Sequence, residues 1–303
     1  MIPEFPQFKK LEFSDKKDVE KFTSKFPPYS DFNFISMWIW DISNNMEISQ
    51  LNKNLVVVFS DYISGKPFIS FIGKNKISET ALELINFSKK NYQTSSLKLI
   101  PEEMAKILMK LGFSAIPDLN SHDYIYSTSH LANMDAWHQN SSSKRIRQFI
   151  KKYPDFFIRQ YSSVKKISKN EYLEVFKKWT KNKKIENYFE LSEYKAFEKL
   201  FQADNENIKV LSLYLKNILI GFSIFEILAD NYAISHFIKA DISFHSSVYD
   251  ILNFEEAKIL KNQGIKYYNW EQDLGIQGLR NSKLKYKPSF LLKKYKVSLT
   301  YNN

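Results

Sequence analysis

The most informative segment of the chain reads YNWEQDLGIQGLR, from Tyr268 to Arg280. Its alternation of side chains predicts a short strand over residues 266–270, and a helix is predicted over residues 274–284. The chain has only seven glycines, and two of them, Gly275 and Gly278, stand where this helix begins. Because glycine destabilises a helix, their presence here predicts close approach of a ligand or of another part of the backbone.

Strand and helix patterns alternate through the rest of the chain as well. Three strands between residues 209 and 238 are separated only by short turns, which predicts an antiparallel meander. Strand–helix–strand patterns around it predict an α+β fold with mixed sheets flanked by helices. The length of 303 residues suits two domains. A Ser/Asn/His-rich stretch near residues 127–140 places their boundary and gives domains of residues 1–130 and 131–303.

The composition indicates a folded protein with a basic surface. A hydrophobic content of 44% is ample for packed cores, and the absence of cysteine excludes disulfides, thiolate nucleophiles and Cys-based metal sites. The net charge of +11 favours an anionic partner such as RNA or lipid headgroups. A generally basic proteome explains the same charge equally well, because almost all of the basic residues are lysines.

The sequence shows neither a signal peptide nor an apolar run long enough to span a bilayer. We therefore expect a cytoplasmic protein without a transmembrane anchor, which could still act at the inner face of a membrane. His130 and His138 lack an acidic partner at metal-ligand spacing, so no metal is predicted. The oligomeric state is left open.

Three more segments accompany the opening one: PPYSDFNF at residues 27–34, HFIKAD at residues 236–241 and VYDILN at residues 248–253. Together the four segments resemble the C-terminal, catalytic domain of bacterial phosphatidylglycerol lysyltransferases. The EQDLG and GLR strings of the opening segment are the most specific part, and the resemblance covers nearly the whole chain. It implies two fused domains of the acyl-CoA N-acyltransferase-like (GNAT) fold, as in the Fem-type peptidoglycan aminoacyltransferases.

In these relatives an aminoacyl-tRNA is the donor, and a lipid hydroxyl or a peptide amine is the acceptor. The resemblance therefore implies an aminoacyl- or acyltransferase with tRNA and an anionic lipid or a peptide as partners. An alternative stays open: a GNAT-derived module that has lost catalysis and binds RNA or an anionic membrane surface.

Acetyl-CoA is disfavoured as the donor. GNAT proteins that use acetyl-CoA hold its pyrophosphate with a glycine-rich loop between the central strand and its helix. The corresponding stretch here, residues 240–247, reads ADISFHSS and contains no glycine. Other residues adopt the turns of such a loop only at an energetic cost, so no cofactor besides an aminoacyl-tRNA donor is expected.

Three side chains are candidates for catalysis. Strand alternation directs Glu271 to the face opposite Trp270, where a carboxylate could deprotonate an attacking amine or hydroxyl. Asp273 either shares this task or closes the helix start through the amide of Gly275 or Ile276. His236 is either a base for acyl transfer or a structural histidine of its strand.

The candidates for substrate binding surround these three. Arg280 either pairs with a nearby carboxylate or binds a substrate phosphate, and Lys283 lies on the same helical face. A basic amphipathic helix is predicted at residues 141–152, with Ile146, Phe149 and Ile150 toward the core and its basic side chains in solvent. The Fem-type relatives have a comparable helix near the substrate. The full set comprises Arg280, Lys283, Lys239, Tyr249, Asn253, Gly275, Gly278, Arg145 and Arg147.

Overall fold

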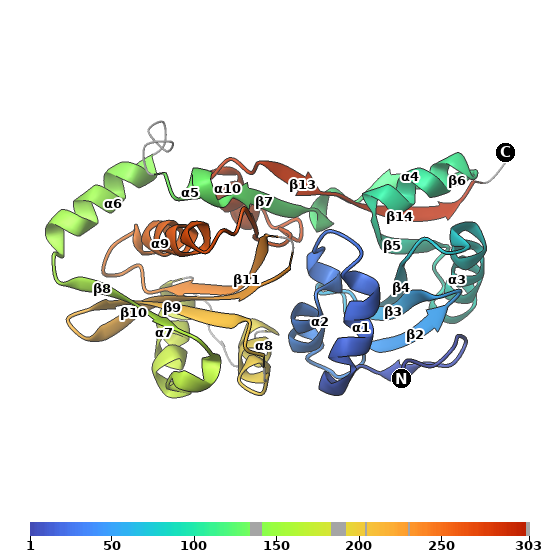
Figure 1. The fold of residues 1–303 in the computed structure, drawn as a ribbon, viewed down its shortest axis with the longest axis horizontal. Coiled ribbons are helices and arrows are strands. Elements are labelled where there is room, and N and C mark those ends of the chain that lie inside the picture. Colours follow the sequence, from blue (N-terminus) through green and yellow to red (C-terminus); the bar gives the residue numbers. More distant parts are fainter. Residues whose placement is uncertain (134–140, 183–191, 204, 230, 301–303) are drawn as a thin grey trace. The chain divides into compact units, whose positions relative to one another are not determined.

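The computed structural model describes residues 1–133, 141–182, 192–203, 205–229 and 231–300. The chain divides into two compact units (Figure 1). Unit 1 comprises Met1–Asp123, Gln272–Gln277 and the segment that begins at Leu291, whereas unit 2 comprises Tyr124–Glu271 and Gly278–Phe290. The sequence placed a single boundary after residue 130. In the structure the chain returns to unit 1 twice, so the last strand does not belong to the second unit.

Unit 1 contains a four-stranded and a three-stranded sheet, ordered β1-β2-β3-β4 and β5-β14-β6. Their strands are β1 (Lys9–Lys10), β2 (Glu47–Leu51), β3 (Asn54–Ser60), β4 (Pro67–Ile72), β5 (Ser96–Pro101), β6 (Phe113–Pro117) and β14 (Lys294–Leu299). The helices are η1 (Phe13–Asp15), α1 (Lys16–Thr23), η2 (Ser30–Phe32), α2 (Phe34–Trp40), α3 (Ile77–Tyr92), α4 (Glu102–Lys110) and η3 (Leu119–Ser121). All pairings within both sheets are antiparallel.

An inner strand of each sheet in unit 1 pairs with a neighbour on both sides. The run LVVVF at residues 55–59 is buried on both faces of β3, as a continuous apolar run predicts. In the second sheet the centre is β14, where Val297 pairs with Leu97 on one side and with Ala115 on the other. Unit 1 is therefore complete only when residues from the C-terminal part of the chain have joined it.

A buried ionic cluster ties β14 to the rest of unit 1. The Lys294 side chain is fully buried, and its Nζ contacts Asp31 Oδ2, Asp123 Oδ1 at 2.7 Å and Ser30 Oγ at 3.2 Å. Asp123 in turn accepts hydrogen bonds from the Ser30 amide and hydroxyl. Charges removed from water require such partners, because burial without them is strongly unfavourable.

Unit 2 is built on a seven-stranded sheet ordered β13-β7-β12-β11-β10-β9-β8. Its strands are β7 (Asp123–Ser127), β8 (Phe156–Tyr161), β9 (Ile208–Leu215), β10 (Ile218–Ile227), β11 (Tyr232–Ala240), β12 (Tyr267–Asn269) and β13 (Phe290–Leu292). The predicted meander is confirmed as β9, β10 and β11, which pair antiparallel. Lys216 and Asn217 both have positive φ, as the tight turn between β9 and β10 requires.

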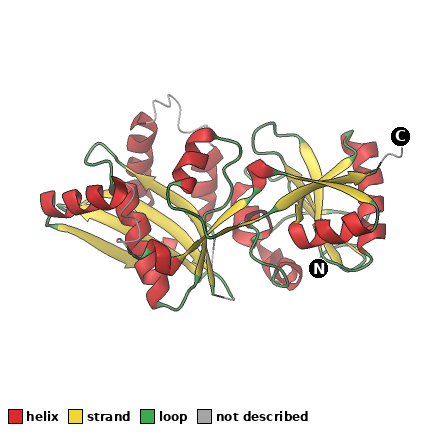
Figure 2. Ribbon diagram, turned by 90° about the horizontal axis from the view of Figure 1, so that it is seen from above, coloured by secondary structure: helices red, strands yellow, loops and turns green. Residues whose placement is uncertain are grey.

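Helices cover both faces of the β8–β11 part of this sheet (Figures 1 and 2). Helix α9 lies on one face, and α7 packs against β10 and β11 on the other. The helices are α5 (Thr128–Leu131), α6 (Ser141–Lys152), η5 (Val164–Lys166), α7 (Lys169–Asn182), α8 (Ser192–Leu200), α9 (Val248–Asn262) and α10 (Gln277–Leu284). Phe222 of β10 packs on Tyr172, Phe176 and Phe197, which together form an aromatic core. Within the described ranges no helix combines the length and the apolar character needed to cross a membrane.

The parallel strands β11 and β12 part after a short pairing. Only Tyr232–Ile234 of β11 pairs with β12, so β11 continues alone for its last six residues on that side. A β-bulge accompanies the separation, because Ile224 pairs with Phe237 and Phe225 with Ser235. His236 is the extra residue of this bulge, a feature that re-aims side chains next to functional sites.

We expect the substitution Lys294→Met to destabilise the protein by about 3–5 kcal/mol at neutral pH, because it leaves two buried carboxylates without their ammonium partner. Protonation of these carboxylates removes the unpaired charges, so the difference from the wild type should shrink as the pH falls. Urea unfolding at several pH values measures both effects. The neighbouring change Lys293→Met is the control, since Lys293 is largely exposed; equal losses for both variants would contradict the role of the cluster.

Candidate functional site

Three titratable side chains form an array in unit 2 where β11 and β12 separate. His236 Nε2 lies 3.5 Å from Glu226 Oε2, and His236 Nδ1 lies 3.9 Å from Glu271 Oε1. The side chains of His236 and Glu226 are at most 3% exposed, whereas that of Glu271 is 19% exposed. Both distances exceed a normal hydrogen bond but allow strong attraction once His236 is protonated. The array therefore leads from the interior to solvent and ends at Glu271.

Glu226 is held in place from its other side. Asn205 Nδ2 donates a hydrogen bond of 2.7 Å to Glu226 Oε1, and both side chains are buried. The amide thus fixes one carboxylate oxygen while the other faces the imidazole. Sequence patterns gave no indication of either residue, because nothing in a strand or loop pattern shows that two distant polar side chains will meet in the core.

Glu271 has an unusual backbone conformation. Its φ of +56° lies in the left-handed region, which residues other than glycine adopt at a cost. The amide of Glu271 donates to Asn269 Oδ1 at 2.7 Å, and its carbonyl accepts from the Tyr124 amide at 3.1 Å. Lys283 Nζ donates to the same carbonyl at 3.2 Å and also to that of Trp270. These contacts hold the left-handed backbone of Glu271 in place against the cost of its conformation.

This arrangement can move a proton. A carboxylate that reaches solvent can accept a proton from an attacking amine or hydroxyl. The neighbouring imidazole can stabilise the carboxylate or take over the proton, and Glu226 stabilises the imidazolium that results. The geometry of Glu226, His236 and Glu271 thus suits general acid–base catalysis.

A second buried carboxyl lies nearby in the same unit. Glu256 of α9 is fully buried, and Ser223 Oγ of β10 lies within 3.0 Å of both of its oxygens. Burial raises the pKa of Glu256 to about 8, even though the hydrogen bond from Ser223 favours the ionised form. Glu256 is therefore largely protonated near neutral pH.

Most of the chain matches one protein family. A family model described as phosphatidylglycerol lysyltransferase, C-terminal, matches residues 24–298. The chain belongs to this family. A search among curated proteins found no significant match.

Solved structures with the same fold include members of this family. A conserved protein of unknown function from Bacteroides thetaiotaomicron is 24% identical, with a TM-score of 0.80 over 99% of this chain and 100% of that chain. L-PGS from Bacillus licheniformis is 13% identical, with a TM-score of 0.63 over 99% and 94% of the two chains. FemX is 10% identical, with a TM-score of 0.56 over 96% of each chain. The predicted GNAT-like fold, shared with Fem-type proteins, is confirmed, and family and fold indicate an acyltransferase.

The predicted site residues of α10 and of the turn before it differ in their contacts. Lys283 binds backbone carbonyls, and Arg280 lies half-buried on α10. Asp273 is fully buried, and its Oδ1 accepts from the Gly275 amide at 2.8 Å, so the structure shows the turn-closing alternative. This turn delays the helix, which begins at Gln277 instead of residue 274.

The two glycines of this segment differ. Gly275 has a φ of +75°, and a Cβ there would lie 2.9 Å from Asn120 Nδ2. Close approach is therefore confirmed at Gly275, although the approaching group is a side chain. A Cβ at Gly278 would meet no atom within 4 Å, so no described contact requires glycine at that position.

The predicted binding residues of β11 and α9 are engaged within unit 2. Lys239 is buried, its Nζ lies 2.8 Å from Glu193 Oε2, and it stands 4.0 Å from the centre of the Trp179 ring. Burial raises the pKa of Tyr249, and the nearby Glu193 charge adds to this effect. Asn253 is buried on the same helix.

The predicted basic helix is present as α6, but its faces differ from the expectation. Arg145 was expected in solvent; instead its guanidinium turns inward to Asp250 Oδ2 at 3.0 Å. Ile150 was expected in the core and is 42% exposed. Arg147 is exposed, as are Lys144, Lys151 and Lys152. The periodicity identified the helix but not the buried anion that draws Arg145 inward.

Asp250 is the centre of a cationic cluster that the sequence did not reveal. Lys285 Nζ lies 2.6 Å from Asp250 Oδ1, and the Tyr286 hydroxyl donates to the same oxygen. Burial opposes ionisation, but the hydrogen bonds from Lys285, Tyr286 and Arg145 hold the pKa of Asp250 below its ordinary value. The cluster joins α6, α9 and the end of α10.

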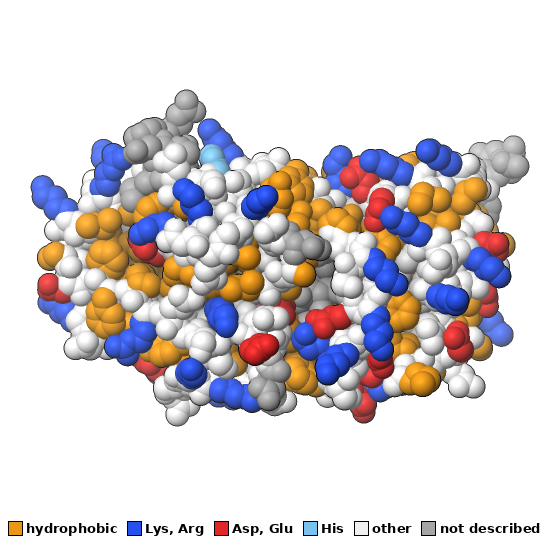
Figure 3. Space-filling view, in the orientation of Figure 1, with side chains coloured by type: hydrophobic (Ala, Val, Ile, Leu, Met, Phe, Trp, Pro, Cys, Tyr) orange, Lys and Arg blue, Asp and Glu red, His pale blue; other side chains and the backbone are white. Residues whose placement is uncertain are grey.

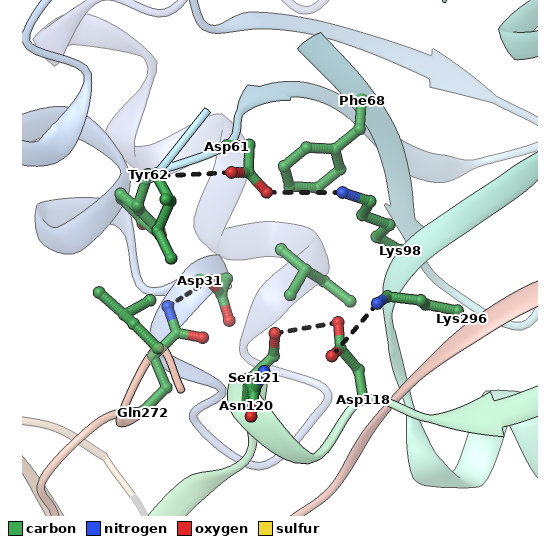
Figure 4. Close-up of a pocket in the computed structure, with 13 residues that line it drawn as sticks. Asp31, Asp61, Tyr62, Phe68, Lys98, Asp118, Asn120, Ser121, Gln272 and Lys296 are labelled. Atoms are coloured by element: carbon green, nitrogen blue, oxygen red, sulfur yellow. Dashed lines mark hydrogen bonds and ion pairs between the residues drawn. The ribbon is translucent and has the colours of Figure 1, made fainter. Parts of the chain in front are cut away.

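Unit 1 contains a pocket that the sequence did not indicate either (Figure 4). It has a volume of about 150 Å³ and is open to solvent. It is lined by Asp31, Asp61, Tyr62, Ile63, Phe68, Lys98, Leu99, Asp118, Asn120, Ser121, Gln272, Leu274 and Lys296. We refer to it as the unit 1 pocket. Among the described residues, no group of three or more His, Cys, Asp or Glu side chains is placed to hold a metal ion, and His138 lies outside the described residues.

The left-handed conformation of Glu271 gives a test by stability. Glycine adopts this conformation without strain whereas alanine does not, so we expect Glu271→Gly to be more stable than Glu271→Ala by about 1 kcal/mol. Neither variant has a carboxylate, so both should be equally impaired in any reaction that needs one. Thermal unfolding measures the difference, and a more stable alanine variant would show that Glu271 is not strained.

Proposed function

We propose that the chain is an aminoacyltransferase that moves an aminoacyl group from aminoacyl-tRNA to an amine or to a lipid hydroxyl. The observation that carries the proposal is the array of Glu226, His236 and Glu271 at the separating ends of β11 and β12. Ligands of sheets with parallel strands bind beyond the carboxyl ends of those strands. Glu271 lies just after the end of β12, and His236 lies in the part of β11 that continues past that end. Membership of the family supports the same reaction class.

The array supplies the proton transfers of such a reaction. The acceptor nitrogen or oxygen attacks the ester carbonyl of the donor, and Glu271 takes the proton that this atom loses. The ester C–O bond then breaks, and the same proton goes to the departing 3′ or 2′ oxygen of the tRNA. A new amide or ester bond replaces the old ester, so no further reactant is needed. His236 stabilises the two charge states of Glu271, and Glu226 keeps His236 in position.

The loop after β11 supports a donor other than acetyl-CoA. Asp241 is buried, and its Oδ1 accepts from the Ser243 amide at 3.1 Å and from the Ser243 hydroxyl at 2.6 Å. Asp241 Oδ2 is paired with Lys178 Nζ at 3.4 Å, so a pyrophosphate is disfavoured because the Asp241 carboxylate already occupies the Ser243 amide of this loop. His245 and Ser247 bond to each other in the same loop, at 2.8 Å between Nδ1 and Oγ.

The exposed basic residues support attraction of an anionic substrate. Lys and Arg side chains are spread over the visible face of both units in Figure 3. The exposed side chains of Lys144, Arg147, Lys151 and Lys152 form a basic face of α6. Such charges raise the rate at which a polyanion such as tRNA reaches the protein. The same face suits the headgroups of an anionic membrane, where a lipid acceptor would be found.

Binding of charged tRNA, uncharged tRNA and acetyl-CoA to the purified protein at physiological salt tests the proposed donor. We expect selective retention of charged tRNA. Equal, strongly salt-dependent retention of both tRNAs would instead favour a non-catalytic nucleic-acid-binding module. Tight binding of acetyl-CoA would contradict the argument from the Asp241 loop.

The proton transfer is tested with Glu271→Gln. We expect this variant to discharge aminoacyl-tRNA about 100-fold more slowly or worse, in the presence of phosphatidylglycerol vesicles or a peptide amine, because the amide cannot accept the proton. Its retention of charged tRNA should be unchanged. Glu174→Gln is the matched control, since Glu174 is exposed on α7. Undiminished discharge by Glu271→Gln would remove Glu271 from the mechanism.

A further inference from the structure

The unit 1 pocket lies within a unit that the proposed transfer chemistry does not use. It opens beside the buried cluster of Lys294, because Asp31 belongs to both the cluster and the pocket wall. Segments far apart in the sequence build this wall: η2, the turn after β3, strands β4, β5 and β14, the residues around η3 and the segment from Gln272 to Leu274.

A buried acceptor in the wall lacks a donor. Gln272 Nε2 donates to Asp31 Oδ1 at 3.2 Å, and this bond fixes the amide orientation, because an amide oxygen would be repelled by a carboxylate. Gln272 Oε1 is buried and has no hydrogen-bond partner among the described residues. Figure 4 shows this oxygen directed into the pocket, toward the space between Asp31 and Ser121. A ligand that donates a hydrogen bond would satisfy it.

The charges in the wall favour a positive ligand. Lys98 lies 3.5 Å from Asp61, and Lys296 lies 3.5 Å from Asp118, so both ammonium groups of the wall already have a carboxylate. Behind the wall, Lys294 is shared between Asp31 and Asp123. The wall and the cluster therefore carry one more carboxylate than ammonium groups.

We propose that the unit 1 pocket binds a small molecule through a primary ammonium group. The three N–H donors of this group match Gln272 Oε1, the Asp31 carboxylate and the Ser121 hydroxyl oxygen. Ser121 Oγ already donates to Asp118 Oδ2 at 3.1 Å, which leaves its lone pairs for the ligand. An amino acid or an amino alcohol has a suitable size. The proposal concerns unit 1 alone and stands or falls separately from the reaction proposed for unit 2.

Titration of Asp31 should couple to this binding. Burial raises the pKa of Asp31, the Asp123 charge raises it further, and Lys294 and Gln272 act in the opposite direction. The other charged groups that face the pocket are the paired Asp61, Asp118, Lys98 and Lys296. A cation favours the ionised carboxyl. Affinity should therefore fall as the pH is lowered through the raised pKa of Asp31, and binding at such pH values should release protons.

The test is isothermal titration of the full chain with ethanolamine, L-alanine, acetate and ethylene glycol. We expect both ammonium compounds to bind, and neither acetate nor ethylene glycol, which lack the ammonium group. The change Gln272→Met removes the acceptor and should weaken binding about tenfold or more, because the lost bond is to a charged donor. Gln148→Met is the matched control, since Gln148 is exposed on α6. Asp31→Asn should also bind more weakly, with thermal unfolding reporting whether each variant is folded.

The outcomes separate the sources of the ammonium group. Tighter binding of L-alanine than of ethanolamine would identify an amino acid whose carboxylate meets Lys98 or Lys296, and the reverse order would identify a simple amine. The proposal would be overturned if neither ammonium compound bound at tens of millimolar, or if acetate or ethylene glycol bound as well as ethanolamine. Undiminished affinity in a folded Gln272→Met variant would overturn it too.

Discussion

The contact of Lys294 with Asp31 and Asp123 is the constraint on which the architecture of unit 1 depends. Two carboxylates and one ammonium group lie out of reach of water, and none of them is tolerable there without the others. The ammonium group comes from β14, which is separated from Asp123 by 171 residues and from Asp31 by 263. All of unit 2 lies between Asp123 and Lys294 in the sequence. Unit 1 therefore cannot close its second sheet or neutralise its buried carboxylates before the chain has passed through unit 2. Contacts of such long range are slow to form, because a large loop must close first.

The segment from Asn269 to Gly275 belongs partly to unit 2 and partly to unit 1. Glu271 ends one portion of unit 2, and Gln272 begins the next portion of unit 1. Within unit 2, Asn269, Tyr124 and Lys283 hold the left-handed backbone of Glu271. Within unit 1, Asp273 closes the turn at Gly275, and the Leu274 amide donates to the Asn120 carbonyl. Each end of this short segment is therefore fixed by its own unit. A strained residue such as Glu271 can persist because these contacts outweigh the cost of its conformation.

Local sequence patterns predicted much of the fold, but they could not predict contacts between residues that are far apart in the sequence. The meander from β9 to β11 followed from strand periodicity and turns such as Lys216-Asn217, and the motif resemblance gave the fold family. The placement of β14 could not be predicted, because the pattern of a short strand such as KYKVSL does not show which sheet the strand joins. Glu271 and His236 were identified as candidates, but their partner Glu226 was not, since its role depends on a bulge that brings His236 toward it. Arg145 shows the same limit: helical periodicity places a charge in solvent unless a buried anion, here Asp250, lies opposite.

Positive charge lies mainly on exposed side chains, whereas the charged groups of the candidate sites are mostly carboxylates. The chain has a net charge of +11, yet the candidate sites are rich in carboxylates: Glu226 and Glu271 in unit 2, and Asp31, Asp61 and Asp118 in unit 1. The excess of positive charge therefore belongs mainly to exposed side chains such as those of α6. On the proposed function, these exposed charges attract the polyanionic donor over distances of about a Debye length and are weakened by salt. The buried carboxylates act only at contact, where salt screens them little. Salt should thus change how fast a substrate arrives far more than how the sites discriminate once it is bound, and a basic net charge is compatible with sites that select cationic groups.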